Sequence, residues 1–171
     1  KEFIRGEARW CLWIDDQDVT DAYAIDAIAG RIERVRQARS QSRGKQANDA
    51  AAFPHRFVFA PHTQGTSILV PSVSSERREY LPCGYFDDRT VVVAPNLAMY
   101  GAPLWCLALI ASRLHLVWIA TVCGKLETRY RYSNTLGWNT FPVPTLTDKN
   151  KADLTRCAED ILLAREAHFP A

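Results

Sequence analysis

The 171-residue sequence lacks the short motifs by which many enzymes can be identified from sequence alone. It contains no GxGxxG or P-loop sequence, no HExxH and no GxSxG. It also lacks the Asn-Pro-Pro-Tyr type of motif that grips an extruded adenine, and the Pro-Asp with a downstream acid-x-Lys of many nucleases. These absences argue against catalysis and against a bound cofactor in this chain, and they favour a binding function.

The cysteines and histidines do not have the spacing of a disulfide framework or a metal site. Five cysteines are present, an odd number, and no two of them form a CxxC pair. Cys11, Cys106 and Cys123 lie among apolar residues, where a free thiol behaves as a small hydrophobic side chain. The four histidines have no cysteine or acid at ligand spacing. We therefore expect reduced cysteines, as in the cytoplasm, and no metal.

A strong charge of one sign is also missing, because 21 basic residues nearly balance 19 acidic ones and leave a formal net charge of +2. A polyanionic partner would have to meet a local basic patch rather than a globally basic surface. One such patch is the segment RIERVRQARSQSRGK, from Arg31 to Lys45, in which Glu33 is the only acid. No signal peptide is expected, since charged residues interrupt every apolar run before Trp10.

The longest apolar stretch, APLWCLALIASRLHLVWIATVCG, predicts a helix over residues 104–123. Pro103 suits the first turn of this helix, and Gly124 suits the position after its last residue. Its length alone would allow it to span a membrane. Arg113 and His115 lie near its middle, however, and an arginine there costs roughly 2.5 to 3.5 kcal/mol, so we expect a buried core helix.

The remaining pattern predicts an α+β fold, with a mixed or antiparallel sheet of short strands packed on the long buried helix and flanked by amphipathic helices. A first amphipathic helix should begin near Thr20 and end before Gly44, followed by an exposed loop that covers residues 40–49. A second should begin at Thr147 or Asp148. The expected strands are residues 9–14, 56–60, 67–73, 79–86, 90–95 and the alternating run 125–133.

The segment GKLETRYRYSNTLGW, residues 124–138, alternates charged and apolar side chains. Because successive side chains of a strand point to opposite faces, Glu127, Arg129 and Arg131 would project together while the intervening tyrosines pack. One explanation of this row is a solvated face with ion pairs to a neighbouring strand. The other is nucleic-acid binding, since short donor side chains of the kind that contact phosphate follow directly.

Two longer motifs make the sequence resemble a known family. GKLETRYRYSNTLGWNTFPVP resembles the closing segment of the target recognition domain in MmeI-like type IIL restriction-modification enzymes, and LVPSVSSERREYLPCGYF is similar to a second segment of that family. RWCLWI, the helix leading into RVRQARSQS, and PHRF occur in matching order, so the resemblance spans nearly all of residues 7–144. Trp138 stands where the family often has Tyr, and Val143 where it often has Trp, which are changes conservative in character.

The resemblance implies which side chains read DNA bases. In the family, two positions separated by one residue just before the YRYS segment form a specificity pair, and here these are Glu127 and Arg129. A glutamate can accept a hydrogen bond from cytosine N4, and an arginine can donate two to guanine O6 and N7. Together they would read one C·G base pair in the major groove. Arg131, on the same expected face, is a candidate for contact with an adjacent base.

Phosphate contacts are expected from the basic segment, from the end of the VPSVSS motif and from the residues after YRY. They would give register and salt-dependent affinity without sequence information. For each basic residue of the first segment, a solvated helix face is the alternative explanation. The candidates are Arg36, Arg39, Arg43, Lys45, Ser74, Ser75, Arg77, Arg78, Ser133 and Asn134.

The resemblance also implies a larger setting for the chain. Residues 1–145 would be the recognition domain of a longer polypeptide, and residues 146–171 would begin a connecting helix. The parent would be a cytoplasmic adenine-N6 DNA methyltransferase that uses S-adenosylmethionine, fused in some members to a Mg-dependent nuclease and in others acting in phage defence without one. The expected partners are double-stranded DNA and the methyltransferase domain of the same polypeptide, and no membrane. A protein-interaction domain whose basic face binds an acidic partner is the alternative, and a self-contained enzyme with an unfamiliar site is a third.

Overall fold

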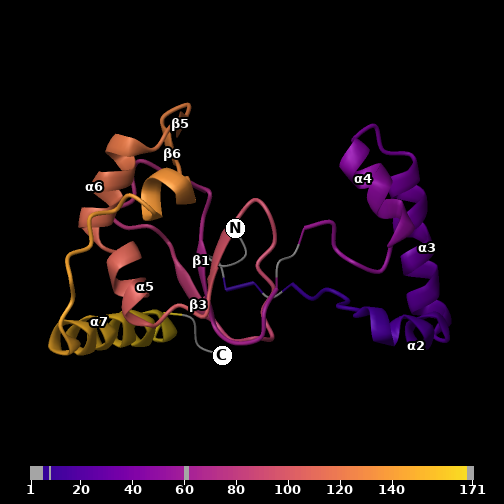
Figure 1. The fold of residues 1–171 in the computed structure, drawn as a ribbon, viewed down its shortest axis with the longest axis horizontal. Coiled ribbons are helices and arrows are strands. Elements are labelled where there is room, and N and C mark those ends of the chain that lie inside the picture. The colour runs from indigo at the N-terminus through magenta and orange to yellow at the C-terminus, as the bar shows by residue number, and fades with distance from the viewer. Residues whose placement is uncertain (1–5, 8, 60–61, 169–171) are drawn as a thin grey trace. The chain divides into compact units, whose positions relative to one another are not determined.

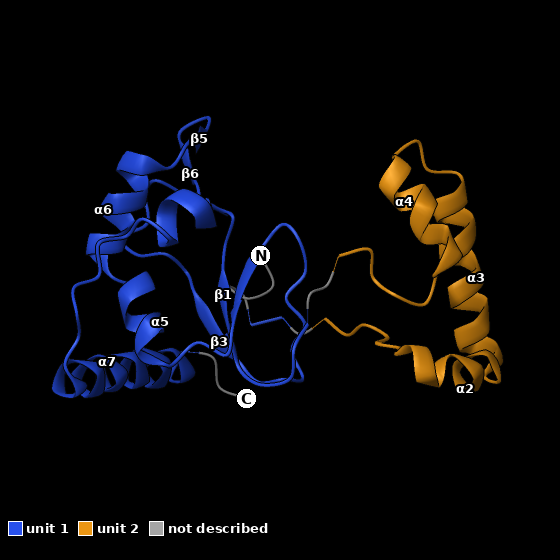
Figure 2. Cartoon of the chain, in the orientation of Figure 1, with its two compact units in different colours: residues 1–7, 61–171 blue, residues 8–60 orange. Residues whose placement is uncertain are grey.

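A computed structural model describes residues 6–7, 9–59 and 62–168 of the chain, and Figure 1 labels its elements. The chain divides into two compact units (Figure 2): unit 1 comprises Lys1–Glu7 and Pro61–Ala171, and unit 2 comprises Ala8–Ala60. Helices together with two small antiparallel sheets make the fold α+β, as the sequence predicted. Both sheets belong to unit 1, whereas the regular elements described in unit 2 are helical.

Unit 2 is built from short helices next to one longer helix, α3. The predicted single helix is interrupted before α3, because Ile25 takes an extended conformation with φ −102° and ψ 106°. Asp26 then begins α3, where a carboxylate complements the positive end of the helix dipole. The elements are η1 (Asp16–Asp18), α2 (Val19–Tyr23), α3 (Asp26–Ser40), α4 (Lys45–Asp49) and η2 (Ala50–Ala52), where η1 and η2 are 3-10 helices.

Other predictions for unit 2 are wrong. Residues 9–14 and 56–59 are not strands, because neither segment pairs with a strand of the described sheets; residue 60 lies outside the described residues. Most of the predicted loop after Gly44 is helical instead. An ion pair of 3.2 Å between Lys45 and Asp49 bridges one turn of α4, and the alanines that follow have the highest helix propensity.

Unit 1 contains two three-stranded antiparallel sheets. The first has the order β3-β1-β4 and the second the order β2-β6-β5. Pro71 separates β1 from β2, and because proline has no N–H to donate, the ladder of β1 stops there and the chain enters the second sheet. The strands are β1 (Ser67–Val70), β2 (Val73–Ser74), β3 (Gly84–Phe86), β4 (Leu97–Tyr100), β5 (Lys125–Leu126) and β6 (Arg129–Arg131).

Other predicted strands of unit 1 differ from those in the structure, and the segment 67–73, predicted as one strand, forms β1 and β2. Only the end of the segment 79–86 forms a strand, β3, because Pro82 cannot donate to a ladder. The apolar run 90–95 is not a strand. Asn96 closes a turn by donating its backbone N–H to the carbonyl of Val93 at 3.2 Å, so the pairing with β1 begins only after it, in β4.

The predicted long core helix is buried as expected, but it consists of two helices, α5 (Trp105–Ile110) and α6 (Arg113–Val122). Ser112 separates them. Its Oγ accepts a hydrogen bond from the backbone N–H of His115 at 3.1 Å and donates to the carbonyl of Leu109 at 2.6 Å. Serine is more favourable at such a capping position than in a helix interior. The break was not predicted because the residues on both sides of Ser112 are apolar. Within the described residues no helix is both long and apolar enough to cross a membrane.

The core of unit 1 gathers residues from β1, β3, α5 and α6, and from the C-terminal helix α7 (Asp148–Glu166). Helix α7 begins where predicted, because Thr147 and Asn150 form a reciprocal capping box at its start. It packs on α5 and places Ala158 in the core. The largest fully buried side chains include those of Ile68, Leu81, Leu107, Ile110 and Ile119.

Candidate nucleic-acid interface

The alternating segment folds into the hairpin of β5 and β6, which follows α6 (Figure 1), rather than into one strand. Leu126 pairs with Arg129, so Glu127 and Thr128 form a two-residue turn. Glu127 has a φ of 58°, in the left-handed region that tight hairpin turns use. The prediction of a single strand is wrong because Glu-Thr lacks the asparagine or glycine that usually marks such a turn.

Strand β6 nevertheless keeps the predicted alternation. Arg129 and Arg131 are exposed, Tyr130 is half-buried and Tyr132 is buried. Glu127 reaches Arg129 from the turn, and its Oε2 lies 2.7 Å from Arg129 Nη2. With 75% of the glutamate side chain and 45% of the arginine side chain exposed, this ion pair contributes about 1 kcal/mol or less to stability. Both side chains are therefore accessible to a partner.

Strand pairing brings the VPSVSS motif beside the hairpin. Strand β2 pairs with β6, so that Val73 lies opposite Arg131 and Ser74 lies opposite Tyr130. The two motifs that carried the family resemblance are far apart in the sequence, and the second sheet makes them neighbours. The structure thus joins two groups of predicted contact residues into one surface of unit 1.

The turn after β2 carries the accessible residues at the end of the VPSVSS motif and directly after it. Arg77 and Arg78 are exposed, and Ser75 Oγ accepts a hydrogen bond from the backbone N–H of Arg77 at 3.2 Å. Ser74, by contrast, is only 5% exposed. The alternation along β2 turns the side chain of Ser74 into the unit, so the structure does not present it to a phosphate at the surface.

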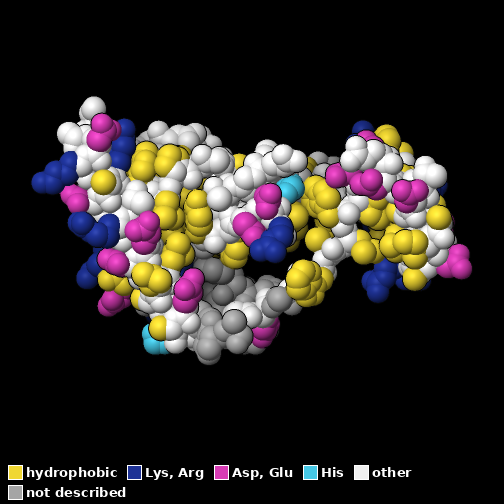
Figure 3. All heavy atoms as spheres, turned by 90° about the horizontal axis from the view of Figure 1, so that it is seen from below, with side chains coloured by type: hydrophobic (Ala, Val, Ile, Leu, Met, Phe, Trp, Pro, Cys, Tyr) yellow, Lys and Arg dark blue, Asp and Glu magenta, His cyan; other side chains and the backbone are white. Residues whose placement is uncertain are grey.

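Basic and acidic side chains lie interspersed on the face of unit 1 drawn in Figure 3. This distribution agrees with the net charge of +2. Attraction of a polyanion to unit 1 would therefore come from a local group of exposed arginines and not from its whole surface. That group, the hairpin arginine cluster, consists of Arg77, Arg78, Arg129 and Arg131.

The two predicted contacts after β6 differ in their surroundings. Ser133 caps the π-helical turn η3 (Asn134–Trp138), and its Oγ accepts a hydrogen bond from the backbone N–H of Leu136 at 3.4 Å. The hydroxyl acts here as an acceptor, so its own hydrogen is still available for donation to a phosphate oxygen. Asn134 is exposed at the start of the turn and remains a candidate for contact.

In unit 2, Arg39, one of the predicted phosphate contacts, makes hydrogen bonds that hold the unit together. Its Nη1 donates to the carbonyls of Ala50 and Phe53 at 3.0 and 2.9 Å, and its Nη2 donates to that of Arg56 at 2.6 Å. Partial burial lowers the pKa of its guanidinium group. Because carbonyl oxygens already occupy these donors, Arg39 ties α3 to η2 and the segment after it, and these donors are not free to bind a phosphate.

The other predicted contacts of unit 2 are exposed. Arg36 donates from Nη2 to the hydroxyl of Tyr23 at 2.8 Å, and its Nε lies 3.2 Å from Glu33 Oε2. Lys45 is paired with Asp49 on the surface of α4. Arg43 lies in the turn between α3 and α4. Exposed ion pairs are weak, so phosphate groups could replace the acids in them.

Behind the hairpin, one buried histidine joins α6, β6 and the segment after η3. His115 is 0% exposed, and its Nε2 lies 3.1 Å from the hydroxyl oxygen of Tyr132. Its ring meets that of Phe141 edge to face, with 4.6 Å between centroids. Burial lowers the pKa of His115 to about 4, so the imidazole is neutral at physiological pH.

Sequence reasoning missed some residues of this region. The sequence around a lone histidine in an apolar helix does not show whether the side chain only packs in the core or also holds a neighbouring strand by a hydrogen bond. His115 was therefore not predicted as part of the site. Lys125 and Thr128 are exposed beside the turn and extend the surface around Glu127. Recognition of the hairpin would have identified both, since the residues that flank a tight turn share its surface.

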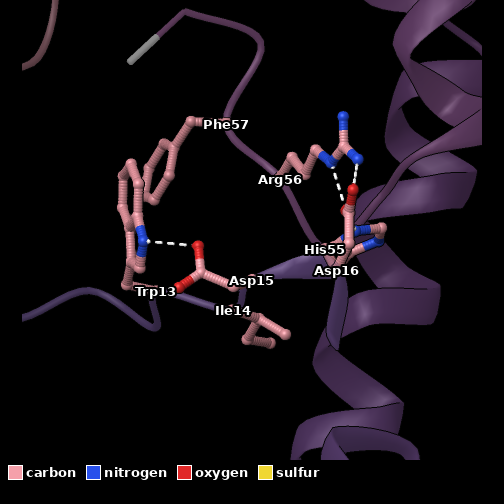
Figure 4. Close-up of a pocket in the computed structure, with 7 residues that line it drawn as sticks. All are labelled: Trp13, Ile14, Asp15, Asp16, His55, Arg56 and Phe57. Carbon is pink, nitrogen blue, oxygen red and sulfur yellow. Dashed lines mark hydrogen bonds and ion pairs between the residues drawn. The ribbon is translucent and has the colours of Figure 1, made fainter. Parts of the chain in front are cut away.

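Unit 2 also contains a hollow of about 310 Å³ (Figure 4). Trp13 and Phe57 stack there with 5.8 Å between ring centroids, and Asp15 accepts a hydrogen bond from Trp13 Nε1 at 3.1 Å. Asp16 pairs with both His55 and Arg56. Because these acids are matched by donors of the same unit, the cluster serves to hold the two segments together. Among the residues described, no group of three or more metal-ligating side chains occurs.

The fold and the site together define an α+β binding module whose arginine-bearing hairpin is supported by a buried aromatic cluster. Its sequence matches the family model described as "MmeI, target recognition domain" over residues 1–145. The chain belongs to this family, which confirms the resemblance found in its motifs.

Two relatives give the extent of the similarity. DNA methyltransferase A of Bacillus subtilis (strain 168) is 36% identical over 165 residues, which are 96% of this chain and 19% of that protein. A solved structure of the type IIL restriction-modification enzyme MmeI in complex with DNA is 32% identical, with a TM-score of 0.88, and the match covers 97% of this chain and 22% of that one. The chain thus spans about a fifth of the length of these relatives.

Proposed function

We propose that this chain recognises a specific sequence in double-stranded DNA, as the target recognition module of a restriction-modification or phage-defence adenine-N6 DNA methyltransferase. The observation that carries the proposal is the β5–β6 hairpin, which presents Glu127, Arg129 and Arg131 at exposed positions. Membership of the MmeI target recognition domain family supports it, as does the likeness to MmeI solved with DNA.

The side chains of the hairpin suit one base pair of the major groove. Arg129 can donate two hydrogen bonds to guanine O6 and N7, and Glu127 can accept one from cytosine N4. The two side chains contact each other at 2.7 Å, and a C·G pair presents its acceptors and its donor side by side in the same manner. Binding would therefore exchange the ion pair for two contacts of matching polarity. Arg131 is a candidate for contact with an adjacent base.

Phosphate contacts in this proposal come from the exposed donors of each unit. Such contacts supply affinity that falls as salt concentration rises, without reading the sequence. Arg39 and Ser74 are left out of the proposal, because the donors of Arg39 are bonded to carbonyl oxygens and the side chain of Ser74 is buried. The proposed contacts are Ser75, Arg77, Arg78, Ser133 and Asn134 in unit 1 and Arg36, Arg43 and Lys45 in unit 2.

Catalysis is assigned to other parts of the polypeptide. Because the chain spans about a fifth of its relatives, we infer that a methyltransferase domain of the same polypeptide transfers the methyl group from S-adenosylmethionine to adenine N6. A nuclease, where present, would use Mg²⁺. The chain itself is proposed to bind neither. Methyl transfer to DNA by the purified chain alone, persisting through further purification, would contradict this division.

The test is selection of duplexes from a random library by the full-length protein, with sequencing of the bound fraction and a salt series on one selected duplex. We expect one enriched motif that contains a required C·G base pair, and a steep linear fall of log affinity with log salt concentration. Equal retention of all duplexes, together with tight binding of an acidic protein, would instead support the protein-interaction alternative.

A further inference from the structure

We propose that His115 is a positioning residue for DNA recognition: through its hydrogen bond to Tyr132 it fixes the direction in which β6 presents Arg129 and Arg131. The inference rests on the proposed function, since it concerns the accuracy with which the hairpin meets a base pair. It assigns a role to a buried histidine that touches no DNA.

The position of His115 links three segments of unit 1. It belongs to α6, and its Nε2 lies 3.1 Å from the Tyr132 hydroxyl oxygen, next to the last residue of β6. Its ring lies 4.6 Å from that of Phe141 and 6.0 Å from that of Trp138, measured between centroids. These two aromatic residues come from the end of η3 and the segment after it. A displacement of His115 would therefore also shift Tyr132 after β6 and the aromatic residues at and after the end of η3.

Tyr132 transmits this anchoring to the reading face. It follows Arg131 directly, and successive side chains of an extended strand point to opposite faces, so the direction of the tyrosine ring determines that of the arginine. The backbone on either side is also fixed. The N–H of Tyr132 donates to the carbonyl of Ser72 at 2.8 Å, and the N–H of Arg131 donates to that of Gly124 at 3.0 Å.

The Tyr132 ring is also in close contact with a glycine. A Cβ atom at Gly137 would lie only 3.2 Å from Tyr132 Cζ, which is tighter than ordinary van der Waals contact. The backbone of η3 thus approaches the ring as closely as glycine allows, while His115 holds its hydroxyl. The hydrogen bond and the close backbone together restrict the ring, and the direction of β6 is restricted with it.

Stability alone does not explain a polar pair at this place. Nδ1 of His115 is buried and has no hydrogen-bond partner among the described residues, and an unpaired buried polar atom is unfavourable. Two phenyl rings of similar shape would avoid this penalty, since replacing both partners of a buried hydrogen bond by apolar groups can be nearly neutral. What a phenyl pair would lack is the directional contact, and this is the property that positioning requires.

The test compares variants of the full-length protein in the duplex selection described above. Tyr132→Phe and the double variant His115→Phe with Tyr132→Phe remove the hydrogen bond, and in the double variant no partner is left unpaired. Tyr130→Phe is the matched control, because it removes a hydroxyl from the neighbouring inward tyrosine of the same strand. Two quantities are measured for each: affinity for random duplex and base preference at every position of the motif.

We expect both test variants to keep their affinity for random duplex within about twofold and to lose about tenfold in preference at the position read by Arg129. Tyr130→Phe should match the wild type in both. If Tyr132→Phe fails to fold, the double variant decides. A folded double variant with full base preference, or one that loses affinity for all duplexes alike, would overturn the positioning role while leaving DNA recognition intact. A wild-type protein without base preference would overturn the proposed function as well.

Discussion

Arg129 and Glu127 are expected to determine one position of the recognition site. Arg129→Ala should relax that position alone, since a lost bidentate contact changes discrimination by about 1 to 3 kcal/mol. Glu127→Lys combined with Arg129→Asp should favour a different base pair, because the polarity of the two contacts is reversed. The measurement is the methylated motif that each variant produces, after thermal melting has established folding. If the variants fold, are active and still methylate the original sequence, then Glu127 and Arg129 form only a surface ion pair and do not read a base.

Glu127 occupies a backbone conformation that glycine adopts more easily. Its φ of 58° is left-handed, which costs a residue with a Cβ atom roughly 1 to 2 kcal/mol. Glu127→Gly should therefore leave the free energy of unfolding unchanged or raise it by about 1 kcal/mol, while the preference for C·G weakens because only the contact to cytosine N4 is lost. Thr128→Ala is the matched control in the same turn. Melting of the chain and duplex selection give the two readouts, and a glycine variant of much lower Tm would assign the glutamate a role in folding.

The basic residues of the α3 and α4 region should separate into two kinds. Arg43→Gln with Lys45→Gln should weaken binding to all duplexes and flatten the log-log salt slope by up to roughly 0.9 for each lost contact, with little change in Tm. Arg39→Gln should instead lower the stability of unit 2 by about 2 kcal/mol or more, because it breaks three hydrogen bonds to carbonyls. An unchanged salt slope in the first variant would make those residues ordinary surface.

Local elements were predictable where neighbouring residues decide them. The alternation from Arg129 to Tyr132 and the start of α7 at Asp148 follow from side-chain periodicity and from a capping box, and both are found in the structure. The helix break at Ser112 was not predicted, because the apolar residues on both sides continue the helical periodicity and one serine does not interrupt it. The Glu-Thr turn was hidden because its positive φ falls on a residue that rarely adopts one.

Contacts between distant segments were not predictable from the sequence. The pairing of β2 with β6, which forms the hairpin arginine cluster, depends on the chain changing sheets at Pro71. Likewise, no local pattern indicates that the Arg39 guanidinium meets the carbonyls after η2. A basic residue has the same appearance in the sequence whether its donors face solvent or backbone oxygens, so the sequence could not separate Arg39 from the exposed basic residues near it.

His115 makes the stability of unit 1 depend on pH. Burial lowers its pKa from 6.5 to about 4, so the unfolded chain takes up a proton at a higher pH than the folded chain. This contribution to stability is full above about pH 6.5 and decreases as the pH falls toward 4, by on the order of 3 kcal/mol in total. Tyr132 stays neutral, because burial raises its pKa. The double variant His115→Phe with Tyr132→Phe should flatten the plot of Tm against pH in this range. A plot as steep as that of the wild type would mean that carboxylates, and not His115, cause the loss of stability at low pH.

Helix α7 sets the smallest piece of this chain that can be transplanted. The family match ends at residue 145, yet α7 packs on α5 and keeps Ala158 at 0% exposure. Arg165 also donates from α7 to the carbonyl of Cys83, next to β3. In a chimera that carries only residues 61–145 into a relative, a helix of the relative would have to cover α5. A chimera that extends through Glu166 includes α7, which already packs on α5. The natural junction for exchanging recognition segments between relatives therefore lies beyond α7.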